Sequence, residues 1–131
     1  MPTIRQPAVA GLFYPADTRQ LAHDVQLMLA EARPHELTPK ALIVPHAGYI
    51  YSGTIAATAY ATLRPIAARI RRVVLLGPTH RVAVRGLALP GVDAFDTPLG
   101  RVMLDTAAAS AIAHLPQVSI NSQAHALEHS L

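Results

Sequence analysis

Two short runs of apolar residues, ALIV at 41–44 and VVLL at 73–76, form the clearest hydrophobic pattern in the chain. Each run is continuous rather than alternating and is bounded by proline or glycine. A run of this kind is typical of a strand that is buried on both faces of a parallel sheet. We therefore expect strands over 41–45 and 72–76, joined through an Ala-rich helix over 54–63 in a right-handed βαβ unit.

Helical periodicity and capping residues predict further helices. Apolar positions recur at helical spacing between Leu21 and about Ala32, Asp17 can cap that segment, and Gln20 completes a capping-box pattern. A second Ala-rich helix is expected over 106–114, with Asp105 as its N-cap.

The segment RGLALPGVDAFDTPLGRVML is broken by prolines and glycines, so it predicts short strands and turns with an antiparallel excursion. QVSI at 117–120 predicts one more strand. Together these elements predict a single α/β domain over residues 1–131, with a mostly parallel sheet flanked by helices.

Composition narrows the class of protein. The 131 residues are 51% hydrophobic and 15% charged, which favours a buried globular core over disorder. The absence of cysteine excludes thiolate metal sites, disulfides and a cysteine nucleophile within these residues. No signal-peptide pattern and no apolar stretch of ~18 residues occurs, so we expect a cytoplasmic protein without a membrane partner.

The formal net charge is +3, and the basic cluster at Arg64, Arg69, Arg71 and Arg72 has no interleaved aromatic residues. We interpret these arginines as a solvated connection with cations near a helix end. We do not expect nucleic acid as a partner.

Each apolar run ends at a turn that delivers a histidine, His46 in PHAGYIYSG and His80 in GPTH. Ligands of open α/β sheets bind outside the carboxyl ends of the strands, so two imidazoles there suggest a metal site or an acid/base site. Either histidine taken alone is also compatible with an ordinary strand-end residue that hydrogen-bonds the backbone.

Residues near these histidines could line a pocket. We expect HAGYIYSG to be a loop whose glycines permit close approach and whose hydroxyls face a ligand. The pocket residues expected on this basis are Gly48, Tyr49, Tyr51, Ser52 and Thr79.

The closing segment contains His125, Glu128 and His129 in the order H-x-x-E-H, the inverted zincin signature. On a helix the two histidines would share one face, and Glu128 would act as a general base. A zincin needs a further acidic ligand downstream, where only Ser130 and Leu131 follow, so a zinc protease is not favoured.

The motifs AGLFYPAD, PHAGYIYSG, GPTH and HALEHSL, in this order, resemble the Memo family, which includes component B of the AmmeMemoRadiSam system. The resemblance implies a fold similar to the class III extradiol dioxygenases (LigB-like), with non-haem iron(II) or copper as cofactor. It implies that His46 and His80 are metal ligands and that Glu128 and His129 lie near the same cleft, with His125, Glu128 and His129 in acid/base or supporting roles.

Members of this family are roughly twice as long, so the resemblance implies that residues 1–131 are the N-terminal portion of a longer domain. It also implies that the third protein ligand, usually a cysteine, is missing from this chain. We therefore expect an incomplete fold and little or no turnover by the chain alone. In a complete form, the protein would be a metal-dependent redox protein of dioxygenase-like type.

Two alternatives remain open from the sequence. One is a non-enzymatic signalling module that holds a peptide or phosphopeptide in the same pocket, and the other is an inactive truncated fragment. The expected partner is a small molecule or a peptide at the metal pocket. Self-association or a partner chain could also complete an exposed sheet edge.

Overall fold

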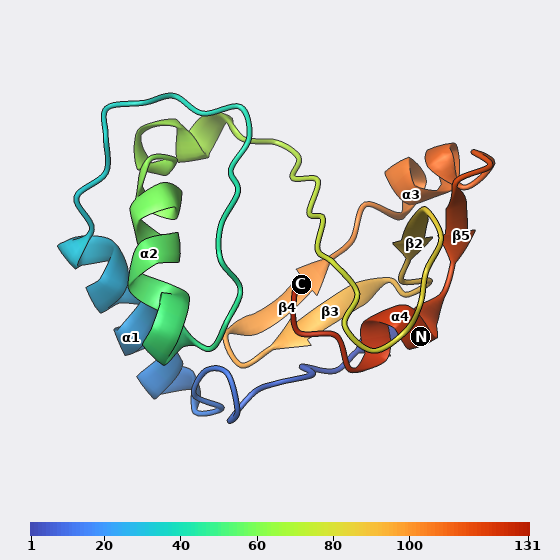
Figure 1. Ribbon diagram of the computed structural model, residues 1–131, viewed down its shortest axis with the longest axis horizontal. Coiled ribbons are helices and arrows are strands. Elements are labelled where there is room, and N and C mark those ends of the chain that lie inside the picture. Colours follow the sequence, from blue (N-terminus) through green and yellow to red (C-terminus); the bar gives the residue numbers. More distant parts are fainter. The chain divides into compact units, whose positions relative to one another are not determined.

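The strands and the two longest helices belong to separate parts of the chain. The computed structural model describes residues 1–131, which divide into two units. We call Met1–Ala10 together with Gly77–Leu131 the strand unit, and Gly11–Leu76 the helix unit. Figure 1 labels most of the elements of each.

The strand unit contains two small sheets and two helices. In chain order its elements are β1 (Ile4–Arg5), β2 (Leu87–Leu89), β3 (Ala94–Thr97), β4 (Gly100–Met103), α3 (Thr106–Ile112), β5 (Val118–Ile120) and α4 (Ser122–Ala126). In one sheet β3 pairs in parallel with β1 and antiparallel with β4, and in the other β2 pairs in parallel with β5. Short strands, mixed pairing and an antiparallel hairpin confirm the pattern expected for the segment 85–104.

Polar side chains fix the ends of these elements. Asp105 accepts a hydrogen bond from the backbone N–H of Ala108 and Asn121 accepts one from that of Ala124, so each caps the first turn of a helix. Gly86 precedes β2 with φ +76°, a conformation that residues with a Cβ rarely adopt. The helix predicted over 106–114 and the strand predicted over 117–120 are thus confirmed within two residues of their expected ends.

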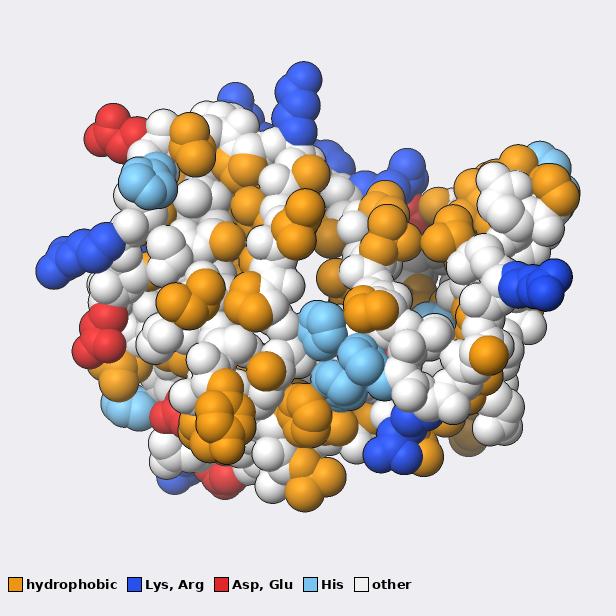
Figure 2. Space-filling model, viewed as in Figure 1, with side chains coloured by type: hydrophobic (Ala, Val, Ile, Leu, Met, Phe, Trp, Pro, Cys, Tyr) orange, Lys and Arg blue, Asp and Glu red, His pale blue; other side chains and the backbone are white.

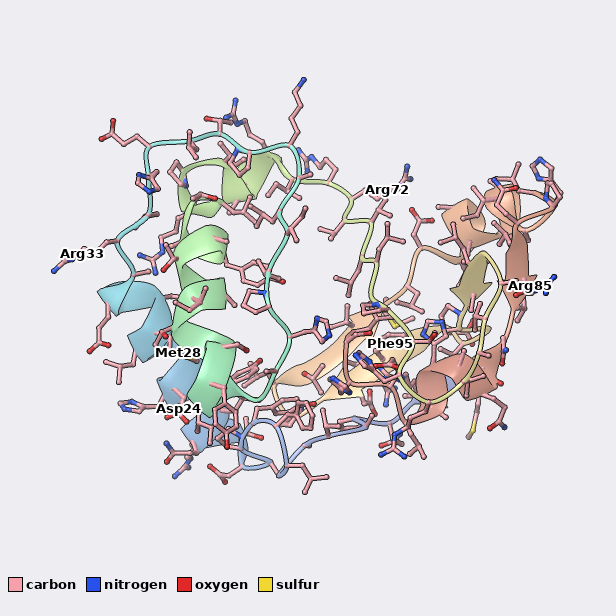
Figure 3. All side chains as sticks on the ribbon, in the orientation of Figure 1. Asp24, Met28, Arg33, Arg72, Arg85 and Phe95 are labelled. Atoms are coloured by element: carbon pink, nitrogen blue, oxygen red, sulfur yellow. The ribbon has the colours of Figure 1, made fainter.

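The helix unit contains α1 (Thr18–Glu31), α2 (Tyr49–Ala61) and the 3₁₀ helix η1 (Arg64–Arg69). Small residues of α2, among them Gly53, form its buried face and pack against α1. Met28 of α1 is labelled in Figure 3; a Cβ added at Gly53 would lie 2.5 Å from its sulfur. The glycine therefore permits the close approach of the two helices.

Two predictions for the helix unit need correction. Asp17 caps α1 as expected, but Gln20 donates its side-chain N–H to Asp24, 2.6 Å away, instead of completing the capping box. The segment 46–53 is not a loop throughout, because α2 already begins at Tyr49, with Gly48 as N-cap. The predicted helix over 54–63 is therefore the second part of a longer one.

The strands predicted over 41–45 and 72–76 do not form, so the expected βαβ unit is also wrong. A strand requires a neighbouring backbone to complete its ladder, and neither run has one. Most of their side chains stay exposed, Ile43 completely and Val74 to 79%, whereas Leu42 and Val44 are half-buried. Figure 2 shows many exposed hydrophobic side chains on the face that it draws.

The chain is therefore an α/β protein with mixed and parallel sheets and accompanying helices. Its buried apolar residues are mostly alanines, and no large side chain is completely buried. None of its helices has the length and apolar character that crossing a membrane requires.

Candidate metal centre

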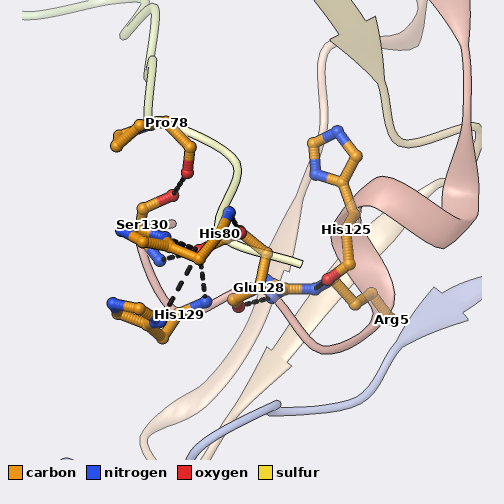
Figure 4. A network of polar contacts seen from close by, with 7 residues as sticks. All are labelled: Arg5, Pro78, His80, His125, Glu128, His129 and Ser130. Carbon is orange, nitrogen blue, oxygen red and sulfur yellow. Dashed lines mark hydrogen bonds and ion pairs between the residues drawn. The ribbon is translucent and has the colours of Figure 1, made fainter. Parts of the chain in front are cut away.

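The strand unit buries a carboxylate, Glu128, beside two histidines. Helix α4 ends at Ala126, so Glu128 lies two residues beyond it, and it is only 3% exposed. Its Oε2 accepts the backbone N–H of His80 at 2.7 Å, and its Oε1 contacts Nδ1 of the same residue at 2.7 Å. The backbone N–H groups of His129 and Ser130 donate to Oε1 at 2.8 and 3.0 Å. Figure 4 shows this network.

These hydrogen bonds decide the charge of the carboxylate. Burial raises the pKa of Glu128. The hydrogen bonds from the ring and backbone of His80 and from the backbone of Ser130 and His129 lower it by more than burial raises it, so the pKa falls to about 2. Glu128 is therefore ionised at neutral pH and can only accept hydrogen bonds.

The ionised carboxylate fixes the tautomer of His80. Because Glu128 can only accept, Nδ1 of His80 must carry the proton, which leaves the lone pair of the neutral ring on Nε2. The His80 side chain is 38% exposed, so this edge of the site is within reach of solvent. A carboxylate that orients an imidazole through one nitrogen is the usual partner of a metal-binding histidine.

A second imidazole lies against the first. The ring of His129 stacks on that of His80 with centroids 4.2 Å apart and planes inclined by 28°. Nδ1 of His129 lies 3.6 Å from Oε1 of Glu128, and a ring nitrogen of each histidine lies within 4.8 Å of one on the other. Two nitrogen donors therefore face the same region from segments far apart in the sequence.

Small residues hold the GPTH loop against the closing segment. The hydroxyl of Ser130 donates to the carbonyl of Pro78 at 2.8 Å. A Cβ added at Gly77 would meet the Ser130 side chain and would lie 2.9 Å from a methyl of Leu131. The predicted GPTH and EHS motifs thus pack directly on one another, and a side chain at Gly77 would separate them.

His125 does not join this pair. It lies within α4, is 8% exposed, and its Nε2 contacts the carbonyl of Ala88 at 2.7 Å. Its ring centroid lies 6.2 Å from that of Phe95. In Figure 4 its ring points away from His80 and His129. The expectation that His125 and His129 share one helix face is therefore wrong, because α4 ends between them.

The other predicted residues are divided between the two units. Thr79 is an exposed residue of the strand unit, whereas His46 belongs to the helix unit with the remaining pocket residues, Gly48, Tyr49, Tyr51 and Ser52. The role of all these residues in a pocket stays a prediction.

Within the helix unit these side chains have defined surroundings. Ser52 is buried and its hydroxyl donates to the carbonyl of Ala47 at 3.0 Å, and Tyr51 is exposed. The ring of Tyr49 lies 5.4 Å from that of Tyr14, and burial together with the neighbouring Tyr14 and Tyr60 raises its pKa.

One residue of the network was not anticipated. Arg5 donates from Nε to the carbonyl of His125 at 2.7 Å and from its terminal nitrogen to the carbonyl of Glu128. Nothing in the local sequence IRQP marks this arginine, because its partners lie at the other end of the chain.

Comparisons with known proteins agree with these motifs. Residues 5–131 match the family model of the Memo-like protein. The chain is 38% identical over 128 residues to a MEMO1 family protein of Aquifex aeolicus, covering 98% of this chain and 46% of that protein. It is 36% identical over 141 residues to a MEMO1 family protein of Pyrobaculum arsenaticum, covering 98% and 48%. It is 40% identical over 101 residues to Protein MEMO1 of Xenopus tropicalis, covering 77% and 33%.

The chain thus spans about half the length, or less, of these curated relatives. The family model nevertheless covers nearly all of the chain, including the PHAGY, GPTH and EHS motifs. The chain therefore belongs to the Memo-like family.

Proposed function

We propose that this protein binds one transition-metal ion through His80 and His129 of the strand unit, with His46 as the further ligand that the family resemblance implies. The observation that carries the proposal is the buried, ionised Glu128 on Nδ1 of His80, with the ring of His129 stacked alongside. A carboxylate in this position orients an imidazole for metal binding and raises its basicity. Neutral imidazoles are common ligands of transition metals, and the two ring nitrogens of His80 and His129 already lie within 4.8 Å of each other. His129 would then take the place of the third ligand that the resemblance assigns to a missing segment.

The donor set limits the metals that fit. Neutral imidazoles suit iron, copper, zinc and nickel, and they do not suit magnesium or calcium, which prefer oxygen ligands. Following the family resemblance, we propose iron(II) or copper. Such an ion would supply Lewis-acid or one-electron chemistry to an oxygen-bearing small molecule.

The residues around the proposed ion would have distinct roles. Glu128 holds the proton at Nδ1 of His80 and keeps the ring in one orientation. A carboxylate with a pKa of about 2 that already accepts four hydrogen bonds is a weak base, so we propose that Glu128 positions His80 and does not abstract protons. The exposed edge of His80 would leave room for substrate.

Metal titration of the 131-residue chain tests the proposal. Protein stripped with EDTA is titrated with ferrous ion under anaerobic conditions and, separately, with cupric ion. We expect one ion per chain and a loss of affinity of about tenfold or more in His46→Ala, His80→Ala and His129→Ala, since changes around metal ligands have effects of this size. His114→Ala, at an exposed histidine of the strand unit, serves as the matched control.

The outcomes separate the proposal from its rivals. Stoichiometric binding that survives the triple variant of His46, His80 and His129 would contradict the proposed ligands. No metal binding, together with metal-independent affinity for a peptide or phosphopeptide, would favour the signalling module. Metal-dependent oxygen consumption would add redox activity to binding.

A further inference from the structure

Arg5 at the end of β1 connects the sheet of the strand unit with the segment that carries Glu128. Its backbone lies opposite Phe95 in the parallel pairing of β1 with β3. Its guanidinium lies 4.7 Å from the centroid of the Phe95 ring, a cation–π arrangement. The base of the side chain is therefore fixed to the sheet, and its charged end is fixed over an aromatic face.

From this fixed position Arg5 reaches the end of α4. The carbonyl of His125 already accepts the backbone N–H groups of Leu127 and Glu128, and it also accepts Nε of Arg5 at 2.7 Å. The carbonyl of Glu128 accepts the terminal nitrogen of Arg5 at 2.5 Å. A planar guanidinium suits this task because its donors have a fixed fork geometry. Helix C-termini leave carbonyls that need such donors, and a cation there is favoured by the helix dipole.

The position of these two carbonyls determines where Glu128 and His129 lie. The backbone between them carries the chain from the last turn of α4 to Glu128, whose carboxylate holds the ring and backbone of His80. The next residue is His129, which stacks on His80. A small rotation of this backbone would move the carboxylate and the second imidazole together.

We infer that Arg5 is a positioning residue for the proposed metal site, and that it acts by clamping the carbonyls of His125 and Glu128. This inference rests on the proposed function only for its effect on metal binding. Its effect on the tautomer of His80 does not require a metal. Figure 4 shows Arg5 beside this backbone, apart from the rings of His80 and His129.

Three variants test the clamp. Arg5→Met keeps an aliphatic stem over Phe95 but removes every donor. Arg5→Lys keeps the cation but replaces the fork by a point donor, which cannot reproduce two fixed hydrogen bonds. Arg101→Met is the matched control, because Arg101 is an arginine of the same unit that forms an exposed pair with Asp96 at 2.6 Å.

Two measurements are made on each variant. Nitrogen-15 NMR of the metal-free protein reports which ring nitrogen of His80 carries the proton, and amide exchange of β3 and β4 reports whether the strand unit is folded. Titration with Co²⁺, followed by its visible absorption, reports affinity and coordination. The loss of a residue that supports metal ligands without touching the metal lowers metal affinity by about 10–100-fold. We expect an effect in this range for Arg5→Met.

The expected result is that Arg5→Met loses the fixed Nδ1–H tautomer of His80 and weakens Co²⁺ binding about tenfold or more, while β3 and β4 stay protected. Arg5→Lys should fall between Arg5→Met and wild type, and Arg101→Met should match wild type.

An unchanged tautomer and a Co²⁺ affinity within twofold of the Arg101→Met value would overturn the inference. If Arg5→Met does not fold, Arg5→Lys decides by the same two readouts. Should the wild-type chain bind neither Co²⁺ nor the ferrous or cupric ion, the proposed function fails, but the tautomer of His80 still decides the role of Arg5.

Discussion

Replacing Glu128 by glutamine tests the central interaction of the candidate site. The carboxylate accepts four N–H donors, from the ring and backbone of His80 and from the backbone of His129 and Ser130. A glutamine has one acceptor oxygen, so its NH₂ group must face at least one of these donors. The best orientation keeps the oxygen where three donors converge and leaves the backbone N–H of His80 without its acceptor.

The loss of stability in Glu128→Gln can be estimated from the hydrogen bonds and from the pKa of the carboxylate. A buried donor left without an acceptor costs about 1–3 kcal/mol, and the other three hydrogen bonds lose their charge assistance. The pKa of Glu128 is lowered from 4.5 to about 2, which corresponds to about 3–4 kcal/mol at ~1.4 kcal/mol per pKa unit. Solvent screening at the exposed edge of His80 reduces this to about 2–3 kcal/mol. We therefore expect Glu128→Gln to lower the free energy of unfolding of the strand unit by about 2–3 kcal/mol at pH 7.

The sign of the pH dependence follows from the direction of the shift. Since the folded-state pKa lies below the unfolded-state value, the carboxylate stabilises the fold fully above about pH 5. This contribution is lost as the pH falls from about 5 toward 2, through the folded-state pKa. The difference between wild type and Glu128→Gln should accordingly shrink over the same range.

The assay must report on the strand unit alone. All four tyrosines lie in the helix unit, so tyrosine fluorescence follows the other unit. Urea unfolding of EDTA-treated protein, followed by the NMR signals of β3 and β4 amides at pH 7 and pH 3, gives the required free energies. Asp96→Asn, at the exposed pair with Arg101, is the control and should have a smaller effect. A difference below about 0.5 kcal/mol at pH 7, or an equal difference at both pH values, would refute the reasoning.

Further substitutions probe the two units separately. Asp17→Ala removes the N-cap of α1 and should destabilise the helix unit by about 1 kcal/mol, measured by urea unfolding with tyrosine fluorescence. Gly86→Ala places a Cβ at φ +76° against the carbonyl of Gln117, and should cost about 1–3 kcal/mol, seen as faster amide exchange in β2 and β5. Gly53→Val should lower the thermal midpoint of the helix unit, because its side chain would overlap Met28; an unchanged midpoint would contradict the packing of α1 on α2.

Local signals in the sequence predicted the elements that depend on local interactions. Asp17 and Asp105 are N-caps because each side chain can reach an N–H three residues ahead, which a short sequence window reveals. The start of α2 does not follow from the sequence pattern, because Gly48 and Gly53 are residues typical of a loop. Gly48 is the N-cap, and Gly53 lies inside the helix where α1 passes closely, a long-range reason that no local pattern contains.

Local sequence patterns do not predict which distant strands pair with one another. The runs at 41–44 and 73–76 have the composition of buried strands, but composition supplies no backbone partner, and both runs remain unpaired. Conversely, β1 is only two residues long and carries no hydrophobic pattern, yet it pairs with β3 and thereby places Arg5. Its partner lies about two thirds of the chain length away, so the existence of β1 depends on tertiary structure.

The closing motif shows how one helix boundary changes the chemistry of a site. If α4 continued to the end of the chain, His125 and His129 would lie on one face, as in an inverted zincin. Because α4 ends at Ala126, His125 turns inward to the carbonyl of Ala88, and His129 turns to His80. Glu128 then accepts donors from a loop 48 residues away, and this geometry supports the orienting role that we propose for it in place of that of a general base.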